Sequence, residues 1–212
     1  MLFAGTPCQI EGLKRYLGKE YDNLYTQDLI CHGVPSPRIW NEYVKYRIKK
    51  ANSNLKNVEF RGKVAGWKNF SFVMRFENGS DYIKNPYRDR MMNMFLFNKN
   101  LRPICHECPF KKIGRVSDYT VADFWGIKYV APELDDNKGT SLMLLHSEKA
   151  KKLFENVKEK AVFKEVDFEL ATKRNPMVKQ SAKKHVRRAR LMKNLNKLPF
   201  EKFLKRYGTF LY

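Results

Sequence analysis

Hydrophobic and polar positions in the first fifty residues alternate between strand-like and helix-like spacing. Short apolar runs at 1–5 and 21–30 predict strands, and apolar residues three or four positions apart predict helices at 9–17 and 38–50. Pro37 is well placed to open the second helix, because a proline at the first helical position leaves no N–H unsatisfied. Two strand-loop-helix units in succession are typical of an α/β domain whose site lies at the carboxyl ends of its strands.

The period of the pattern changes to two between 57 and 83. Residues 58–61 and 70–76 alternate between apolar and polar, and the Asn-Gly pair at 78–79 is a hairpin-turn signal. We therefore expect an antiparallel meander. Its first connection contains Trp67, which either covers a planar ligand or anchors the packing.

The second half of the chain predicts longer elements. Helical spacing predicts a helix at 86–100, alternation predicts strands at 116–124 and 139–145, and a helix is expected at 147–158. From 167 onward the sequence is helical and basic. The predicted fold class is α/β with α+β elements: a mixed sheet with flanking helices, an antiparallel meander insertion and a helical, basic C-terminal extension.

The length and composition bound the organisation of the chain. It has 212 residues, 43% of them hydrophobic, which is enough for one sizeable core. We predict an α/β domain at 1–166 and a basic helical extension at 167–212. No apolar run approaches the roughly 20 residues of a membrane span, and the first residues lack a secretory pattern. We therefore expect a cytoplasmic protein without a membrane span.

The formal net charge is +20, and the basic excess is concentrated near the C-terminus. Residues 173–206 contain thirteen Lys and Arg against one Glu. The run at 183–190 is of the kind that binds phosphates, but no DNA- or RNA-binding module accompanies it, so nucleic acid is not the expected partner. We interpret the region as helices with a solvated basic face, suited also to an acidic protein or an anionic coenzyme tail. The apolar stripe expected to pack on the body comprises Leu191, Leu195, Leu198, Phe203 and Leu204.

Four cysteines carry the candidate chemistry. Cys105 and Cys108 form a Cys-x-x-Cys turn, whose spacing lets two thiolates bind one metal centre. Cys8 and Cys31 each lie in a loop that contains Gly and Pro and follows an apolar run. These positions predict one four-thiolate site assembled from three loops.

Zinc and an iron–sulfur cluster both fit such a site. Cytoplasmic thiols stay reduced, so cysteine clusters there more often bind metal than form disulfides. Zinc sites are usually built from two Cys-x-x-Cys knuckles, whereas single thiolates on separate loops suit a cluster at least as well. From the residues alone, both remain open.

Five blocks of sequence carry a family resemblance, in the same order and over nearly the whole chain. The blocks are GTPCQIEGLKR, DLICHGVPSP, GWKNFSF, LRPICHECPFK and SDYTVADFWGI. Together they resemble the beta subunit of coenzyme F420 hydrogenase/dehydrogenase and its bacterial relatives. The resemblance implies an oxidoreductase subunit that carries a [4Fe-4S] cluster and FAD and passes electrons between them and a hydride acceptor or donor such as coenzyme F420.

The resemblance also implies site residues and partners. Cys8, Cys31, Cys105 and Cys108 are implied to be the cluster ligands. The implied partners are a redox partner subunit or ferredoxin-like protein and a small-molecule hydride acceptor.

Five residues are candidate flavin contacts on this basis. Gly5 and Thr6 are expected to offer backbone and hydroxyl contacts, Lys68 and Asn69 lie on an opposite loop, and Asp123 lies near a strand end. Each also has a purely structural interpretation, as a turn, cap or solvated residue. No catalytic residue is assigned.

One departure from the family and one alternative function remain. Relatives usually have a longer N-terminal part, often with a ferredoxin-like Cys-x-x-Cys-x-x-Cys run, so we expect that an N-terminal portion is missing here. The alternative function is a non-catalytic module, stabilised by zinc or a cluster, that binds an acidic partner through its basic C-terminal helices.

Overall fold

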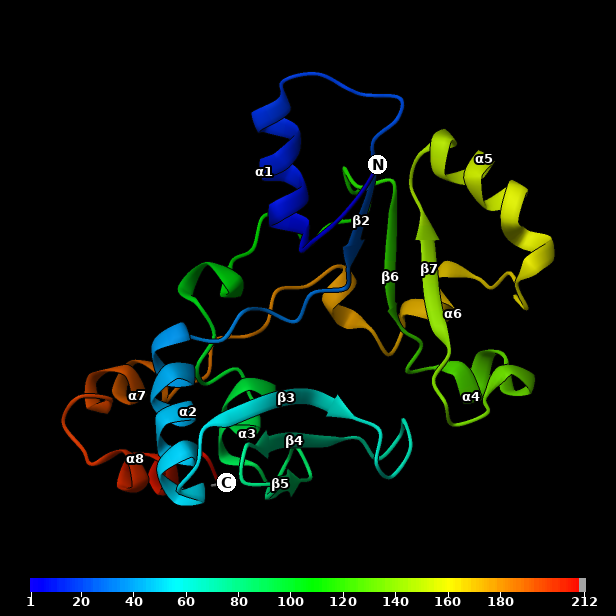
Figure 1. Cartoon of the computed structure of the whole chain (residues 1–212). Helices are drawn as coiled ribbons and strands as arrows, with labels where there is room; N and C mark the ends of the chain where they lie inside the picture. Colours follow the sequence, from blue (N-terminus) through cyan, green and yellow to red (C-terminus); the bar gives the residue numbers. More distant parts are fainter. Residues whose placement is uncertain (210–212) are drawn as a thin grey trace. The chain divides into compact units, whose positions relative to one another are not determined.

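The chain folds as two units, each formed from two separate stretches of sequence (Figure 1). The structure is a computed structural model and describes residues 1–209. Unit 1 comprises Met1–His32 and Cys108–Ser181, and unit 2 comprises Gly33–Glu107 and the chain from Ala182 onward. The predicted boundary between 166 and 167 falls inside unit 1, and the division into a domain at 1–166 and an extension at 167–212 stays a prediction.

Unit 1 is organised by a four-stranded mixed sheet in the order β1-β2-β6-β7. The first three strands are parallel, and β7 pairs antiparallel with β6. The arrangement confirms the predicted mixed sheet. The strands are β1 (Leu2–Ala4), β2 (Tyr25–Leu29), β6 (Tyr119–Asp123) and β7 (Ser141–Leu145).

Helices flank this sheet, with α1 beside β2 and α5 beside β7 (Figure 1). Gly18 ends α1 in the left-handed conformation, with φ of 69°, which glycine adopts without steric cost. Ser147 caps α5 by accepting from the N–H of Ala150. The helices are α1 (Pro7–Leu17), α4 (Ile127–Val130), α5 (Glu148–Val157) and α6 (Phe168–Thr172), with 3-10 turns η2 (Pro132–Leu134), η3 (Lys158–Lys160) and η4 (Pro176–Val178).

Unit 2 contains the predicted antiparallel meander, in the order β3-β4-β5. Its β4–β5 turn places Gly79 at φ of 82°, which explains the Asn-Gly signal in the sequence. The strands are β3 (Leu55–Gly62), β4 (Ser71–Phe76) and β5 (Asp81–Lys84). The helices are α2 (Pro37–Ala51), α3 (Arg90–Leu96), α7 (Arg188–Asn194) and α8 (Phe200–Tyr207), with the 3-10 turn η1 (Pro103–His106).

The helix α3 is shorter than the predicted helix at 86–100. The buried carboxylate of Asp89 accepts from the N–H of Met92 at 2.8 Å and fixes the start of the helix. Asn98 adopts φ of 60° just after its end, which is incompatible with a continued right-handed helix.

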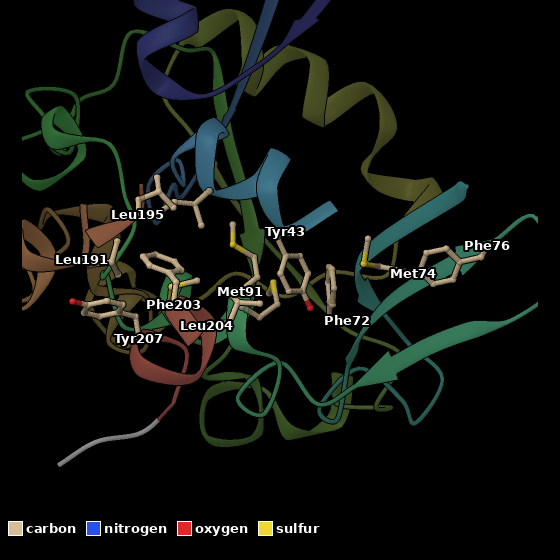
Figure 2. Close-up of a cluster of buried hydrophobic side chains, with 13 residues drawn as sticks. Tyr43, Phe72, Met74, Phe76, Met91, Leu191, Leu195, Phe203, Leu204 and Tyr207 are labelled. Atoms are coloured by element: carbon tan, nitrogen blue, oxygen red, sulfur yellow. The ribbon is translucent and has the colours of Figure 1, made fainter. Parts of the chain in front are cut away.

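The core of unit 2 joins the meander to the C-terminal helices (Figure 2). Side chains from α2, β4, α3, α7 and α8 contribute to it, and each large apolar side chain buried in this way stabilises the fold by roughly 1.5–3 kcal/mol. The buried residues include Tyr43, Phe72, Met74, Met91, Leu191, Leu195, Phe203 and Leu204. The predicted apolar stripe of the basic C-terminal region is therefore confirmed.

No helix in residues 1–209 is long and apolar enough to cross a membrane.

Candidate functional site

Three of the predicted site segments leave the sheet of unit 1 at its carboxyl edge. The strand β1 leads into the turn 5–8, β2 is followed by Cys31, and β6 ends at Asp123. Since these three strands are parallel and adjacent, their carboxyl ends lie at one edge. This edge is where α/β sheets place their ligands.

The turn at 5–8 is tightly held by its own polar groups. The N–H of Gly5 donates to the carbonyl of Gln27 at 3.0 Å, so the turn begins on the sheet ladder. The N–H of Thr6 donates to Gln9 Oε1 at 2.8 Å, and Thr6 Oγ1 lies 3.1 Å from Cys8 Sγ. The exposed thiol of Cys8 therefore sits in the first turn of α1, where the helix macrodipole favours negative charge.

The segments that carry Cys31 and Cys108 are joined within unit 1 by Lys111. Lys111 is 8% exposed, and its ammonium group donates to the carbonyl of His32, the residue after Cys31, at 3.0 Å. The N–H of Lys111 also bonds the carbonyl of Cys108, at 3.5 Å. The N–H of Cys108 donates to Ser181 Oγ at 2.9 Å. Both cysteines are partly buried, so these contacts hold two candidate ligands in neighbouring loops.

Cys105 belongs to unit 2, where it lies in η1. Its Sγ accepts a hydrogen bond from the N–H of Val34 at 3.4 Å. A Cβ atom added to Gly33 would lie 3.3 Å from the Cβ of Cys105 and 2.9 Å from Leu101. The backbone at 33–34 thus lies directly against this cysteine, which is possible only because residue 33 is glycine.

The four cysteines are therefore divided between the units, with Cys8, Cys31 and Cys108 in unit 1 and Cys105 in unit 2. In residues 1–209, no group of three or more His, Cys, Asp and Glu side chains is placed to hold a metal ion. The four-thiolate site stays a prediction.

The predicted flavin contacts are divided in the same way. Gly5, Thr6 and Asp123 lie at the sheet edge of unit 1, whereas Lys68 and Asn69 are exposed in the β3–β4 connection of unit 2. The contact of these five residues with one ligand stays a prediction.

Two neighbours refine the picture of the predicted contacts. The carbonyl of Asp123 accepts from Asn175 Nδ2 at 3.0 Å, which anchors the end of β6. Trp67, beside Lys68, is only 3% exposed, which supports packing rather than a cover for a ligand.

A buried polar network that includes side chains of β2 and β6 was not identified from the sequence. Arg115 pairs with Asp28 at 3.0 Å, and both side chains are at most 3% exposed. The hydroxyl of Thr120 donates to Asp28 and lies 2.7 Å from His146 Nε2. The available signal was the carboxylate of Asp28 inside the strand predicted at 21–30, because a carboxylate that becomes buried needs a partner.

A second buried carboxylate, Asp118, lies beside this network. It accepts from the N–H and hydroxyl of Thr26, at 2.7 and 2.8 Å, and from Ser147 Oγ at 2.7 Å. Burial raises the pKa of Asp118, but the hydrogen bonds from Ser147 and Thr26 and the charge of Lys149 outweigh it, so its pKa is lowered. Burial lowers the pKa of His146 and favours the neutral imidazole. Near neutral pH, Asp118 therefore stays ionised and His146 stays neutral, which suits a network that stabilises the fold.

The fold is thus that of a mixed α/β protein with cysteine-bearing loops at the carboxyl edge of its parallel strands. Residues 1–170 match the family described as the C terminus of the coenzyme F420 hydrogenase/dehydrogenase beta subunit. The chain belongs to this family, which confirms the resemblance carried by the five sequence blocks. The family consists of hydrogenase and dehydrogenase subunits, so its members are parts of oxidoreductases.

Comparisons with individual proteins add one solved structure. The chain is similar to a chain of the F420-reducing [NiFe] hydrogenase complex from Methanosarcina barkeri, with 12% sequence identity and a TM-score of 0.45. The similarity covers 93% of this chain and 62% of that chain, so this chain spans less than two thirds of its length. No curated protein matches the sequence.

Proposed function

We propose that the chain is an iron–sulfur flavoprotein subunit that relays electrons between a [4Fe-4S] cluster, FAD and a hydride donor or acceptor such as coenzyme F420. The observation that carries the proposal is the position of Cys8 and Cys31 on adjacent loops at one sheet edge, in a member of this family. Sheet edges of this kind are where α/β proteins bind redox cofactors.

The donor set suits a cluster. Cys8, Cys31, Cys105 and Cys108 would supply four thiolates, the usual ligand set of a [4Fe-4S] centre. The N–H of Val34 donates to the sulfur of Cys105, and the hydroxyl of Thr6 lies within hydrogen-bond distance of the sulfur of Cys8. Hydrogen bonds to ligand sulfurs stabilise the thiolate form and tune the reduction potential of a cluster.

Chain connectivity supports the same set. Cys105 and Cys108 are three residues apart, and Cys31 precedes Gly33, which lies against Cys105, by only two residues. Consecutive Cα atoms are about 3.8 Å apart, so the chain keeps Cys108 within about 12 Å of Cys105, and Cys31 within about 8 Å of Gly33. Only Cys8 reaches the proposed centre from a distant loop.

Three residues at the sheet edge would contact the flavin. A bound flavin supplies exchange of a hydride with one partner and of single electrons with a cluster. Gly5 has its N–H committed to Gln27, so we assign to it close backbone approach rather than a donated hydrogen bond. Thr6 offers a hydroxyl group, and Asp123 offers an acceptor near the end of β6. Lys68 and Asn69 are assigned contacts from the β3–β4 connection, with Lys68 neutralising an anionic group.

A beta subunit implies other subunits. We propose that single electrons are exchanged with a redox partner subunit or a ferredoxin-like protein in the cytoplasm, and a hydride with a small molecule.

The test is the cofactor content of protein purified without oxygen. We expect a brown protein with about four iron and four sulfide per chain, the stoichiometry of one [4Fe-4S] centre, together with one FAD. Each of the four Cys→Ser variants should lose most of its iron. Val162→Ser, a change at a side chain that is 88% exposed, should retain iron and serves as the control.

The opposite result identifies the alternative function. A colourless protein that contains one zinc per chain, and loses it in the same Cys→Ser variants, would falsify the electron relay. It would favour a zinc-stabilised binding module.

A further inference from the structure

The two units differ sharply in charge. Unit 2 contains 25 Lys and Arg against 7 Asp and Glu, a net charge of +18, whereas unit 1 contains 17 against 15, a net charge of +2. The basic character of the protein therefore belongs almost entirely to unit 2. A field of one sign on one unit steers oppositely charged partners and does not specify the fold.

Part of this charge forms a row on α7 and the turns that flank it. Arg187, Arg190, Lys193 and Lys197 follow one another at intervals of three, three and four residues. Arg190 and Lys193 share one face of α7, and Arg187 and Lys197 lie in the turns directly before and after the helix. We call these four residues the cationic stripe. All four are exposed, and none makes an ion pair with any carboxylate in the part of the chain that the structure describes. Like charges at this spacing repel one another, so the stripe is unfavourable in the isolated protein.

The α7 segment is anchored in the core of unit 2 by Leu191 and by its C-cap residue, Leu195. Leu191 is fully buried and Leu195 is 6% exposed. Arg188 donates twice to the carbonyl of Leu101, at 3.0 and 2.8 Å. The cationic stripe therefore projects from an anchored helix, and little backbone order has to be gained when a partner binds.

A protein partner fits the cationic stripe better than nucleic acid does. Residues 183–197 contain no Phe, Tyr or Trp, and the one aromatic ring in this stretch is the partly buried His185, so the stretch offers little on which unpaired bases could stack. Four charges on α7 and its two flanking turns match a small interface. Small, charged interfaces are typical of weak electron-transfer encounters, in which charge complementarity sets the rate of association.

We propose that the cationic stripe is the docking surface for a small electron-carrier protein with a carboxylate-rich face, of the ferredoxin type. The choice of an electron carrier rests on the proposed function. The surface itself rests on the charge of unit 2, the spacing of the four residues and their lack of acidic partners among the described residues. The guanidinium and ammonium groups of the cationic stripe pair with carboxylates of the carrier, and the pairing weakens as salt screens the charges.

The test is binding of a plant-type [2Fe–2S] ferredoxin to the full chain, measured by isothermal titration calorimetry at low and moderate salt. The variant R187E/R190E/K193E reverses three charges of the stripe. The control K56E/K84E/R88E makes the same change in net charge at exposed residues of unit 2 that form no ion pair within residues 1–209. At moderate salt the Debye length is about 8–10 Å, so distant charges of unit 2 contribute little.

We expect the stripe variant to bind the ferredoxin at least about tenfold more weakly than wild type, and the control to change by less than about threefold. Equal weakening in both variants, or no saturable binding at low salt, overturns the proposal. Tighter binding of a short DNA duplex than of the ferredoxin, lost in the same stripe variant, also overturns it and assigns the surface to nucleic acid.

The proposed function fails separately from this inference. Binding of the ferredoxin requires neither iron nor flavin in the chain, and the cofactor content of the same preparations reports on the relay. Protein that binds the ferredoxin through the cationic stripe but contains zinc and no flavin would contradict the electron relay. The partner would then be an acidic protein that is not an electron carrier.

Discussion

The N–H of Val34 donates to the Sγ of Cys105 at 3.4 Å, across 71 positions of sequence. The contact holds the backbone that follows Cys31 and His32 against the Cys-x-x-Cys turn. It depends on Gly33, whose φ of 145° and whose distance to Leu101 leave no room for a side chain. Gly33 therefore determines how closely the backbone at 33–34 approaches Cys105 within unit 2.

Gly33→Ala should displace this loop. The added methyl group meets Leu101 and Cys105, and alanine is strained at this φ, so we expect a loss of about 1–3 kcal/mol in the free energy of unfolding. Urea unfolding measures it. Gly79→Ala, at φ of 82° with no atom within 4 Å of the new Cβ, is the control for conformational strain alone. An equal loss in both variants would show that contact with Cys105 is unimportant.

Asp28→Asn should destabilise the protein strongly. It leaves the guanidinium of Arg115 buried without its carboxylate, and breaking a buried pair in this way costs about 3–5 kcal/mol. The double variant Asp28→Asn/Arg115→Met should recover part of the loss, because no charge is left unpaired. Glu148→Gln, which breaks an exposed pair with Lys151, should change little. A double variant less stable than Asp28→Asn would contradict this account.

Asp118→Asn should alter the dependence of stability on pH. The pKa of Asp118 is lowered in the folded state, so its carboxylate stabilises the fold above the unfolded pKa of about 3.9. That stabilisation is lost as the pH falls through the lowered folded pKa. Wild type should therefore exceed the variant in stability at pH 7, and the difference should shrink below about pH 4.

Unfolding by urea at several pH values between 3 and 7 measures this difference. Asp22→Asn, at an exposed carboxylate, controls for the loss of one negative charge. A difference that stays constant over the whole range would contradict a role for ionised Asp118.

Lys99→Met should loosen the end of α8. The ammonium group of Lys99 donates to the carbonyls of Tyr207 and Thr209, at 3.2 and 2.9 Å, and to Asn93 Oδ1. Without it, partly buried carbonyls lose their donor, at a cost of about 1–3 kcal/mol. Hydrogen exchange should speed up in α8. Lys202→Met, at an exposed position of the same helix, should leave exchange unchanged, and faster exchange there too would point to a general effect of charge.

The strand-loop-helix pattern predicted much of the candidate site. Two such units place Cys8 and Cys31 after neighbouring parallel strands, as the sheet of unit 1 has them. Alternation predicted a strand at 116–124, and β6 occupies Tyr119–Asp123 within that range. These features follow from local spacing and from turn residues, which act over a few positions of the chain.

The buried network could not be predicted in the same way. Arg115 and Asp28 are 87 positions apart, and neither the spacing in the strand of Asp28 nor the loop that carries Arg115 indicates that they meet. The predicted helix at 86–100 was too long because apolar spacing alone does not reveal that the side chain of Asp89 caps the helix. Long-range pairs depend on which strands become neighbours, which is a tertiary property.

The sequence by itself determined the strands and the hairpin turn, the helices α1, α2 and α5, the apolar stripe near the C-terminus and membership of the family, since each is carried by local periods or contiguous motifs. Only the tertiary structure decided that β6 pairs beside β2, that the C-terminal region is shared by both units, and that nearly all of the excess positive charge belongs to unit 2. The physical reason is that strand order and burial depend on which distant surfaces exclude water together, and local spacing does not encode that choice.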